Sequence, residues 1–253
     1  MTVGSLLAVT VTAVAAAPPA EARSTASKPS KVTASVRIES PAKTLFNGFI
    51  STRLRSVNPG AQSDPGCAAP LNVVARSAYV SAVTLLADAA RKIGGNYTAS
   101  STGPQANVCA ISGLINNDAT GERWSLRINN HAAMADSIVK NGDDVLWYFA
   151  GPDVTRSVDL ILPSRIPTGR LVAGRVRAYD NATNARIDIA DIGLAVAGTA
   201  LNRGTDGRFK LKISTPGRFL IDASAPKSVR GSASVCVYRP GSGDCGTKKR
   251  KKR

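Results

Sequence analysis

Apolar and polar residues alternate most regularly between residues 121 and 151, and this pattern predicts two β-strands. Trp124, Leu126 and Ile128 alternate with polar residues, which is the period of a strand with one buried face. From Val145 to Phe149 both alternating sets are apolar, so we expect the second strand to be apolar on both sides. Each tryptophan lies in an apolar alternation, and we expect both to pack in the core.

A polar connection joins these strands and supplies candidate binding residues. Asn129, Asn130 and His131 follow the first strand as neutral polar groups; an exposed loop histidine without a ligand remains the alternative for His131. Residues 141–144, Asn-Gly-Asp-Asp, predict a turn because Asn and Gly tolerate positive φ. Tyr148 points away from the second tryptophan and has a hydroxyl group to satisfy, so it is a candidate to line a binding surface.

Upstream, alternating residues predict a hairpin. Val32–Glu39 forms its first strand and Thr44–Thr52 its second, with Asn47-Gly48 as a turn or bulge inside the second strand. The segments that follow are predicted to be a loop at 58–70, a short strand at Leu71–Val74, a loop at 96–107 and a strand at Val108–Ile115.

The clearest helical pattern runs from Ala78 to Ile93. Ser77 can cap its start, and Gly94-Gly95 ends it. We expect this helix to pack on the core rather than to bind a partner, because apolar residues recur at helical spacing: Tyr79, Val83, Leu86, Ala90 and Ile93.

From about residue 157 the helical period disappears, and short strands recur between turn signals at intervals suited to a β-sandwich. The predicted strands are Val158–Leu162, Leu171–Tyr179, Ala185–Ile189, Leu194–Ala197, Arg208–Ile213, Arg218–Ala223 and Ala233–Tyr238.

The first region, about 32–152, resembles the transcobalamin C-terminal-like domain. The likeness lies in the tryptophan strand ending in Ile-Asn-Asn, the polar connection and the Gly-Asp-Asp-Val-Leu-Trp-Tyr run that starts at Gly142. It implies a β-grasp-like fold and a secreted or surface protein. In the family's namesake this domain closes over a corrinoid held against a separate helical barrel. This chain contains no such barrel, so the resemblance implies a binding surface at the loop rather than a corrinoid site.

The second region, about 158–239, is similar to carboxypeptidase regulatory-like and other prealbumin-like sandwiches. The likeness rests on an Asp-Gly turn before the strand of Phe209 and a Pro-Gly turn before the strand of Phe219. It implies that both phenylalanines face the core and that the domain is a spacer or stalk. The expected fold class is therefore α+β and all-β: a β-grasp-like domain with one main helix, followed by an antiparallel immunoglobulin- or prealbumin-like β-sandwich.

The N-terminus indicates export. Residues 1–22 combine an apolar run with an Ala-Glu-Ala cleavage site, which predicts a signal peptide cut after Ala22; a short apolar strand is the alternative. Residues 23–31 are polar and Ser-rich, as in a disordered leader. We therefore expect a secreted, extracellular or cell-surface protein.

Four cysteines in an exported chain favour disulfides. Three pairings are open, and pairing within domains gives Cys67–Cys109 and Cys236–Cys245. Neither pair has metal-ligand spacing and the chain has one histidine, so we expect no metal site.

The chain is strongly basic, with 33 Lys and Arg against 17 Asp and Glu. Positive charge outside a cell favours anionic polymers or lipid headgroups, although the tail at residues 240–253 can be merely solubilising. Specific nucleic-acid recognition is not expected, because no aromatic residues are interleaved with the charges. The six basic residues that end the disordered tail are Lys248, Lys249, Arg250, Lys251, Lys252 and Arg253.

No catalytic constellation or cofactor motif is present in the sequence. Asp143 and Asp144 are paired carboxylates, but they occupy the predicted turn. The sequence thus predicts a non-enzymatic protein that uses no cofactor, with a β-grasp-like module that recognises a small molecule or partner and a sandwich that presents it. The alternative is a structural cell-envelope protein attached to anionic wall polymers through its basic tail.

Overall fold

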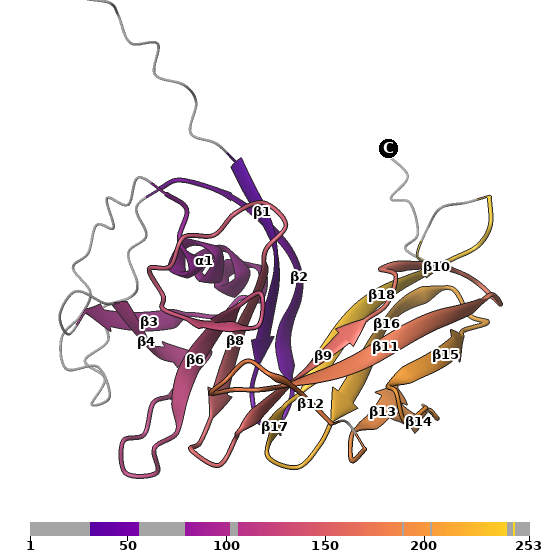
Figure 1. Cartoon of the computed structure of the whole chain (residues 1–253). Helices are drawn as coiled ribbons and strands as arrows, with labels where there is room; N and C mark the ends of the chain where they lie inside the picture. The colour runs from indigo at the N-terminus through magenta and orange to yellow at the C-terminus, as the bar shows by residue number, and fades with distance from the viewer. Residues whose placement is uncertain are drawn as a thin grey trace, which may run out of the picture.

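The computed structural model describes residues 31–55, 79–101, 106–188, 190–202, 204–241 and 245. Within these ranges the chain is mostly β-strand with one helix, and its strands form several sheets around two hydrophobic cores. Figure 1 shows one lobe that contains the helix and a second lobe built from strands. The predicted signal peptide, almost all of the leader, the 58–70 loop, the Leu71–Val74 strand and the basic run at 248–253 lie outside the described residues.

The first lobe is organised by a five-stranded mixed sheet in the order β2-β1-β8-β6-β7. Its two central strands, β1 and β8, run parallel, and their neighbours pair antiparallel. The helix α1 (Ala82–Lys92) lies over one face of this sheet (Figure 1). The strands are β1 (Lys31–Glu39), β2 (Thr44–Arg53), β6 (Arg123–Ile128), β7 (His131–Ala133) and β8 (Asp144–Ala150).

The core of this lobe follows the two-residue period of the strands. Ile38, Leu126 and Trp147 share one face of the sheet and belong to the same core cluster as Leu85 and Leu86 of α1. Trp147 is 2% exposed and Trp124 6% exposed, so the predicted core positions of both tryptophans are confirmed.

The opposite face of the same sheet is also covered. Arg37, Glu39, Arg127 and Leu146 alternate with the core residues, yet each is nearly inaccessible to solvent. The second lobe lies against this face: Arg37 Nη2 donates to the Val158 carbonyl at 3.3 Å. This contact between lobes explains why the strand at 145–149 is apolar on both sides.

The helix begins later than the sequence predicts, at Ala82 rather than Ala78, and Tyr79 is exposed outside it. Val80 is held in an extended pairing, where its carbonyl accepts from Val139 N at 2.9 Å. Ser81 is the N-cap, whereas the predicted cap, Ser77, lies outside the described residues. The first helical amides are satisfied by carbonyls of the 135–137 segment, a tertiary interaction that helical periodicity does not encode.

The Asn47-Gly48 pair forms neither a turn nor a bulge, which corrects the prediction. It continues the regular β1–β2 register, with Asn47 opposite Arg37. The register shift falls instead between Ile38 and Glu39. The Asn47 amide has a tertiary role, because its Nδ2 donates to the Ser232 carbonyl of the second lobe at 2.8 Å.

The prediction of a loop at 96–107 is also wrong, because most of this segment belongs to a three-stranded sheet, β3-β4-β5. Strand pairing supplies backbone partners to a polar segment whose Tyr97 and Ala99 pack into the core. The predicted strand at 108–115 is split by a turn at Ser112 and Gly113, which have φ of 50° and 82°. The strands are β3 (Tyr97–Ser101), β4 (Ala106–Ile111) and β5 (Leu114–Ile115).

The second lobe consists of two sheets that share one core. Phe209 is 4% exposed in that core and Phe219 packs against it partly buried, as predicted. One sheet has the order β12-β11-β9-β17 with β15 also paired to β11. It contains β9 (Arg156–Ile161), β11 (Leu171–Asp180), β12 (Arg186–Ile187), β15 (Arg208–Lys212) and β17 (Ser228–Val229).

The other sheet has the order β10-β18-β16-β13-β14. All seven strands predicted for this half are present, six with slightly shifted ends, whereas the strand predicted at Ala185–Ile189 is reduced to the two residues of β12. The unpredicted strands β10, β14 and β17 have two or three residues each, too few to show a period. The sheet contains β10 (Arg165–Pro167), β13 (Gly193–Val196), β14 (Thr199–Ala200), β16 (Gly217–Ser224) and β18 (Gly231–Tyr238).

Candidate binding groove

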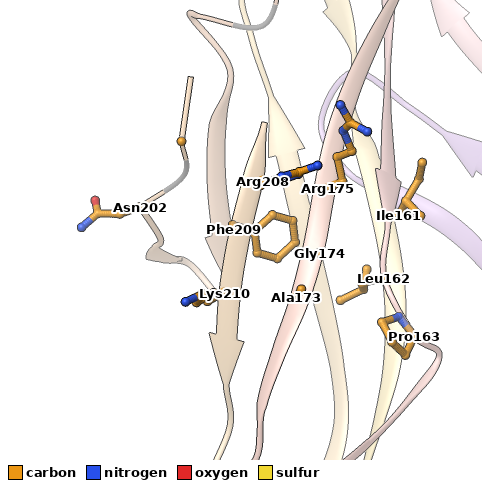
Figure 2. A pocket seen from close by; sticks show the side chains of 11 residues that line it. Ile161, Leu162, Pro163, Ala173, Gly174, Arg175, Asn202, Arg208, Phe209 and Lys210 are labelled. Atoms are coloured by element: carbon orange, nitrogen blue, oxygen red, sulfur yellow. The ribbon is translucent and has the colours of Figure 1, made fainter. Parts of the chain in front are cut away.

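An open, mainly apolar groove of about 950 Å³ lies on the second lobe, where β9 ends beside β11 and β15. Figure 2 shows the side chains of Ile161, Leu162 and Pro163 on one side of the strand that contains Ala173 and Gly174. Ligand sites are typically hollows of roughly 300–1,000 Å³ with apolar walls and few polar groups, and this groove falls within that range.

Gly174, which lines the groove, leaves room for the ring of Phe209. Gly174 is paired with Phe209 across β11 and β15, and a Cβ on the glycine would lie 2.2 Å from Phe209 Cζ. The aromatic ring therefore occupies the space above the glycine. This packing joins the two strands and places an aromatic surface on the groove wall.

Positive charge borders one side of the apolar surface. Arg175, Arg208 and Lys210 line the groove, and Arg175 is directly opposite Arg208 in the strand pairing. Arg208 Nε forms an ion pair with Asp206 Oδ2 at 3.2 Å. Within the described part of the chain, the buried Nε atom of Arg175 has no hydrogen-bond partner.

This groove is not among the sites predicted from the sequence, although one local signal for it exists. Arg208, Lys210 and Lys212 alternate with buried Phe209 and Leu211, so β15 has one wholly cationic face. Recognising the groove additionally requires the pairing that places Arg175 opposite Arg208, and this pairing joins residues 33 positions apart in the sequence.

Asn129, the first residue of the sequence-predicted site, closes the end of the β6–β8 ladder. Its Nδ2 donates to Asp143 Oδ1 and its Oδ1 accepts from Asp144 N, both at 2.9 Å. Asp143 Oδ2 also accepts from Lys140 N at 2.7 Å. The Asn-Gly-Asp-Asp segment is thus a turn, as predicted, and both its carboxylate residues take part in it.

Asn130 and His131 lie at the junction between the lobes. Asn129 and Asn130 have φ of 52° and 65°, and they form the tight turn between β6 and the unpredicted strand β7. The Asn130 carbonyl accepts from Arg127 Nη2. His131 Nδ1 lies 3.3 Å from Asn184 Nδ2 of the second lobe. The ligand-contacting role of these side chains stays a prediction.

Tyr148, the fourth predicted residue, faces a polar cavity of about 360 Å³ between the lobes. Glu39 and Arg230 also line it. Burial raises the pKa of Glu39 above its ordinary value, against the opposing charge of Arg37 and the hydrogen bonds that Glu39 accepts from Ser232 and Thr44. The structure thus brings Tyr148 near the lobe junction but to a different cavity from the apolar groove.

The predicted Cys236–Cys245 disulfide is present, with Cα atoms 5.1 Å apart. Cys109 is also disulfide-bonded, whereas its predicted partner, Cys67, lies outside the described residues.

Among the described residues, no cluster of His, Cys, Asp or Glu could hold a metal ion. The same part of the chain contains no helix long and apolar enough to cross a membrane.

Comparisons with known proteins add little to this picture. No protein-family model and no curated protein matches the chain. Among solved structures, the CARDB domain of a Pyrococcus furiosus protein is similar to part of it, with 14% identity and a TM-score of 0.27. The alignment covers 33% of this chain and 94% of that domain. A similarity of this strength supports no conclusion about function.

Proposed function

We propose that this chain is a non-enzymatic binding protein of the cell surface or its surroundings, and that the groove on its sandwich lobe holds a small ligand. The observation that supports this most strongly is the groove itself: an apolar hollow bordered by Arg175, Arg208 and Lys210 on one exposed sheet. The functional class is the one inferred from the sequence. The groove is a second candidate site for the ligand, besides the residues predicted from the sequence in the first lobe.

The proposed architecture is a β-grasp-like lobe docked on a β-sandwich. The parallel pair β1–β8 between antiparallel neighbours, with α1 over one face, supports the first assignment. Two sheets around one core support the second. The buried contacts of Arg37, Glu39 and Arg127 with the second lobe support the proposal that the sandwich presents the first lobe as a fixed unit.

Export is part of this proposal. It rests on the apolar N-terminal run and the Ala-Glu-Ala site, and the Cys236–Cys245 disulfide is compatible with it. Mass spectrometry of secreted protein should find Arg23 at the N-terminus. Recovery of the uncleaved chain from the cytoplasm alone would contradict export.

A thermal-shift screen of the exported protein against small molecules and cell-wall glycans tests the binding function, because a ligand of the native state raises the melting temperature. An Ala173→Trp variant fills the groove and serves as the matched control. We expect at least one compound to raise the melting temperature of the wild type and not that of Ala173→Trp.

A compound that stabilises both proteins equally would place binding outside the groove. Asn130→Ala and His131→Ala then test the first lobe. Loss of binding in these variants, with the melting temperature nearly unchanged, would support the site predicted from the sequence. No stabilising compound and no captured partner would contradict the binding function.

The formal net charge of +16 favours a second candidate, a structural envelope protein attached through residues 248–253 to anionic wall polymers. Deleting this run should weaken retention on such polymers, and added salt should weaken retention of the intact protein. Equal, salt-insensitive retention of both forms would exclude the electrostatic attachment.

A further inference from the structure

Two arginines face each other on the outer surface of the sandwich lobe at a position where strand pairing disfavours like charges. Arg175 and Arg208 are direct partners in the β11–β15 register, so their Cβ atoms lie about 4.5–5.5 Å apart on the same face. Opposed like charges in such a pair destabilise a sheet. In a fold that otherwise follows the preferences of strand pairing, unfavourable contacts of this kind concentrate at functional sites.

The charge around this pair is only partly neutralised. Asp206 lies next to Arg208, but Arg175 Nε is buried without a partner among the described residues. Lys210, opposite Ala173, adds a third cation at the same edge of the groove. An anionic ligand group beside the opposed cations would offset their mutual repulsion.

The apolar part of the groove begins directly beside these cations. Arg175 is paired with Ile161 at the end of β9, and Leu162 and Pro163 continue the apolar wall (Figure 2). Ile161 is 41% exposed, so it leaves apolar surface for a ligand to cover. The arrangement fits an elongated molecule with its charged end at the arginine pair and its apolar chain along Ile161 to Pro163.

We propose that this groove binds a free anionic amphiphile, a single acid group joined to an apolar chain. The inference rests on the proposed binding function and specifies its ligand class. Guanidinium groups form strong, charge-assisted hydrogen bonds with carboxylate or phosphate oxygens, and burial of the chain adds hydrophobic stabilisation in proportion to its area. The commitment to a single molecule, rather than a membrane surface, rests on the location of the cations and the apolar wall within one groove of about 950 Å³.

Titration calorimetry of the full exported chain with decanoate, 1-decanol and acetate separates the contribution of the acid group from that of the apolar chain. Decanoate should bind in a saturable one-to-one complex, at least ten-fold more tightly than 1-decanol or acetate. Arg175→Gln and Arg208→Gln should each weaken decanoate binding about ten-fold and leave 1-decanol binding unchanged. Lys212→Gln is the matched control, because Lys212 lies on the same face of β15 but outside the groove, and it should bind decanoate as the wild type does.

The remaining outcomes contradict the inference in distinguishable ways. Equal affinity for decanoate and 1-decanol, or arginine variants that bind as the wild type does, would overturn the anionic ligand class and leave a neutral apolar ligand for the proposed function. Binding to anionic vesicles without binding of decanoate would favour a membrane surface instead. If Ala173→Trp still binds decanoate, the groove is not the binding site, and both proposals are wrong about its location. No binding of any probe would overturn the inference, while the broader screen decides the proposed function.

Discussion

At the residue scale, Arg127 shows how the junction between the lobes is built. Its side chain is 1% exposed, and its Nη1 donates to the Asn181 carbonyl at 3.0 Å. Its Nη2 donates to the Asn130 carbonyl and to Asn184 Oδ1. One guanidinium thus joins a hairpin turn of the first lobe to a turn of the second.

We expect Arg127→Met to lower the free energy of unfolding by about 2–4 kcal/mol, because the substitution leaves the partly buried carbonyl groups of Asn130 and Asn181 without this donor. Urea denaturation measures the change. Arg123→Met is the control: Arg123 lies on the same strand, is exposed and has one distant ion pair, with Asp118 at 3.8 Å, so its loss should cost less than about 1 kcal/mol. Similar small changes in both variants would show that the junction does not depend on Arg127.

At the element scale, β11 and β15 pack together through a glycine of one strand and a phenylalanine ring of the other. Gly174 faces Phe209, and the ring occupies the volume of a missing side chain. The same two strands hold the arginine pair, so the packing in the core fixes the geometry of the groove outside it.

Gly174→Ala should therefore destabilise the protein by about 1–3 kcal/mol, the usual cost of overpacking. Adding Phe209→Leu should recover part of this loss, since substitutions that share one contact are not additive. Gly193→Ala is the matched control, because a Cβ there meets only the Ser224 carbonyl oxygen at 3.7 Å. Thermal denaturation that ranks the two alanine variants equally would contradict this account.

The Cys236–Cys245 disulfide ties the chain after β18 back to that strand. Its cysteines are separated by 9 positions, and the chain-entropy model gives such a short loop about 2–3 kcal/mol. Cys245→Ser should therefore cost less than Cys67→Ser, because the predicted 67–109 loop is longer, at on the order of 4 kcal/mol. Denaturant midpoints of both variants test the order, and the reverse order would contradict the chain-entropy account of these disulfides.

At the scale of the whole molecule, two carboxylates lie in the contact between the lobes. Ser232 of the second lobe donates to Glu39 Oε1 at 2.7 Å. Burial also raises the pKa of Asp159, against the opposing charge of Arg37. Both carboxyls thus retain protons in the folded protein at pH values where the unfolded chain has released them.

Because these pKa values are raised in the folded state, the linked stability is fully present below the ordinary carboxyl range and is lost as pH rises through the folded values. The melting temperature of Glu39→Gln should consequently fall less than that of the wild type as the pH rises above the ordinary carboxyl pKa of about 4.3. Asp118→Asn, at an exposed carboxylate, should retain the wild-type dependence. Identical pH profiles for Glu39→Gln and the wild type would exclude a role for this carboxyl.

The sequence by itself determined the elements whose signal is local. Alternation predicted the β1–β2 hairpin, β6, β8 and seven strands of the second lobe, because each strand buries one set of side chains. The Asn-Gly-Asp-Asp turn and both tryptophan positions followed from residue chemistry. The Cys236–Cys245 pair was likewise predicted, from its placement within one domain.

Only the tertiary structure decided the features that join distant segments. The start of α1 depends on carbonyls near residue 136, and β3 is a strand because β4 supplies its hydrogen bonds. The burial of Arg37, Glu39 and Arg127 depends on the second lobe lying against their face of the sheet. The cationic border of the groove likewise depends on the strand pairing that places Arg175 opposite Arg208, and no local periodicity specifies which strands become neighbours.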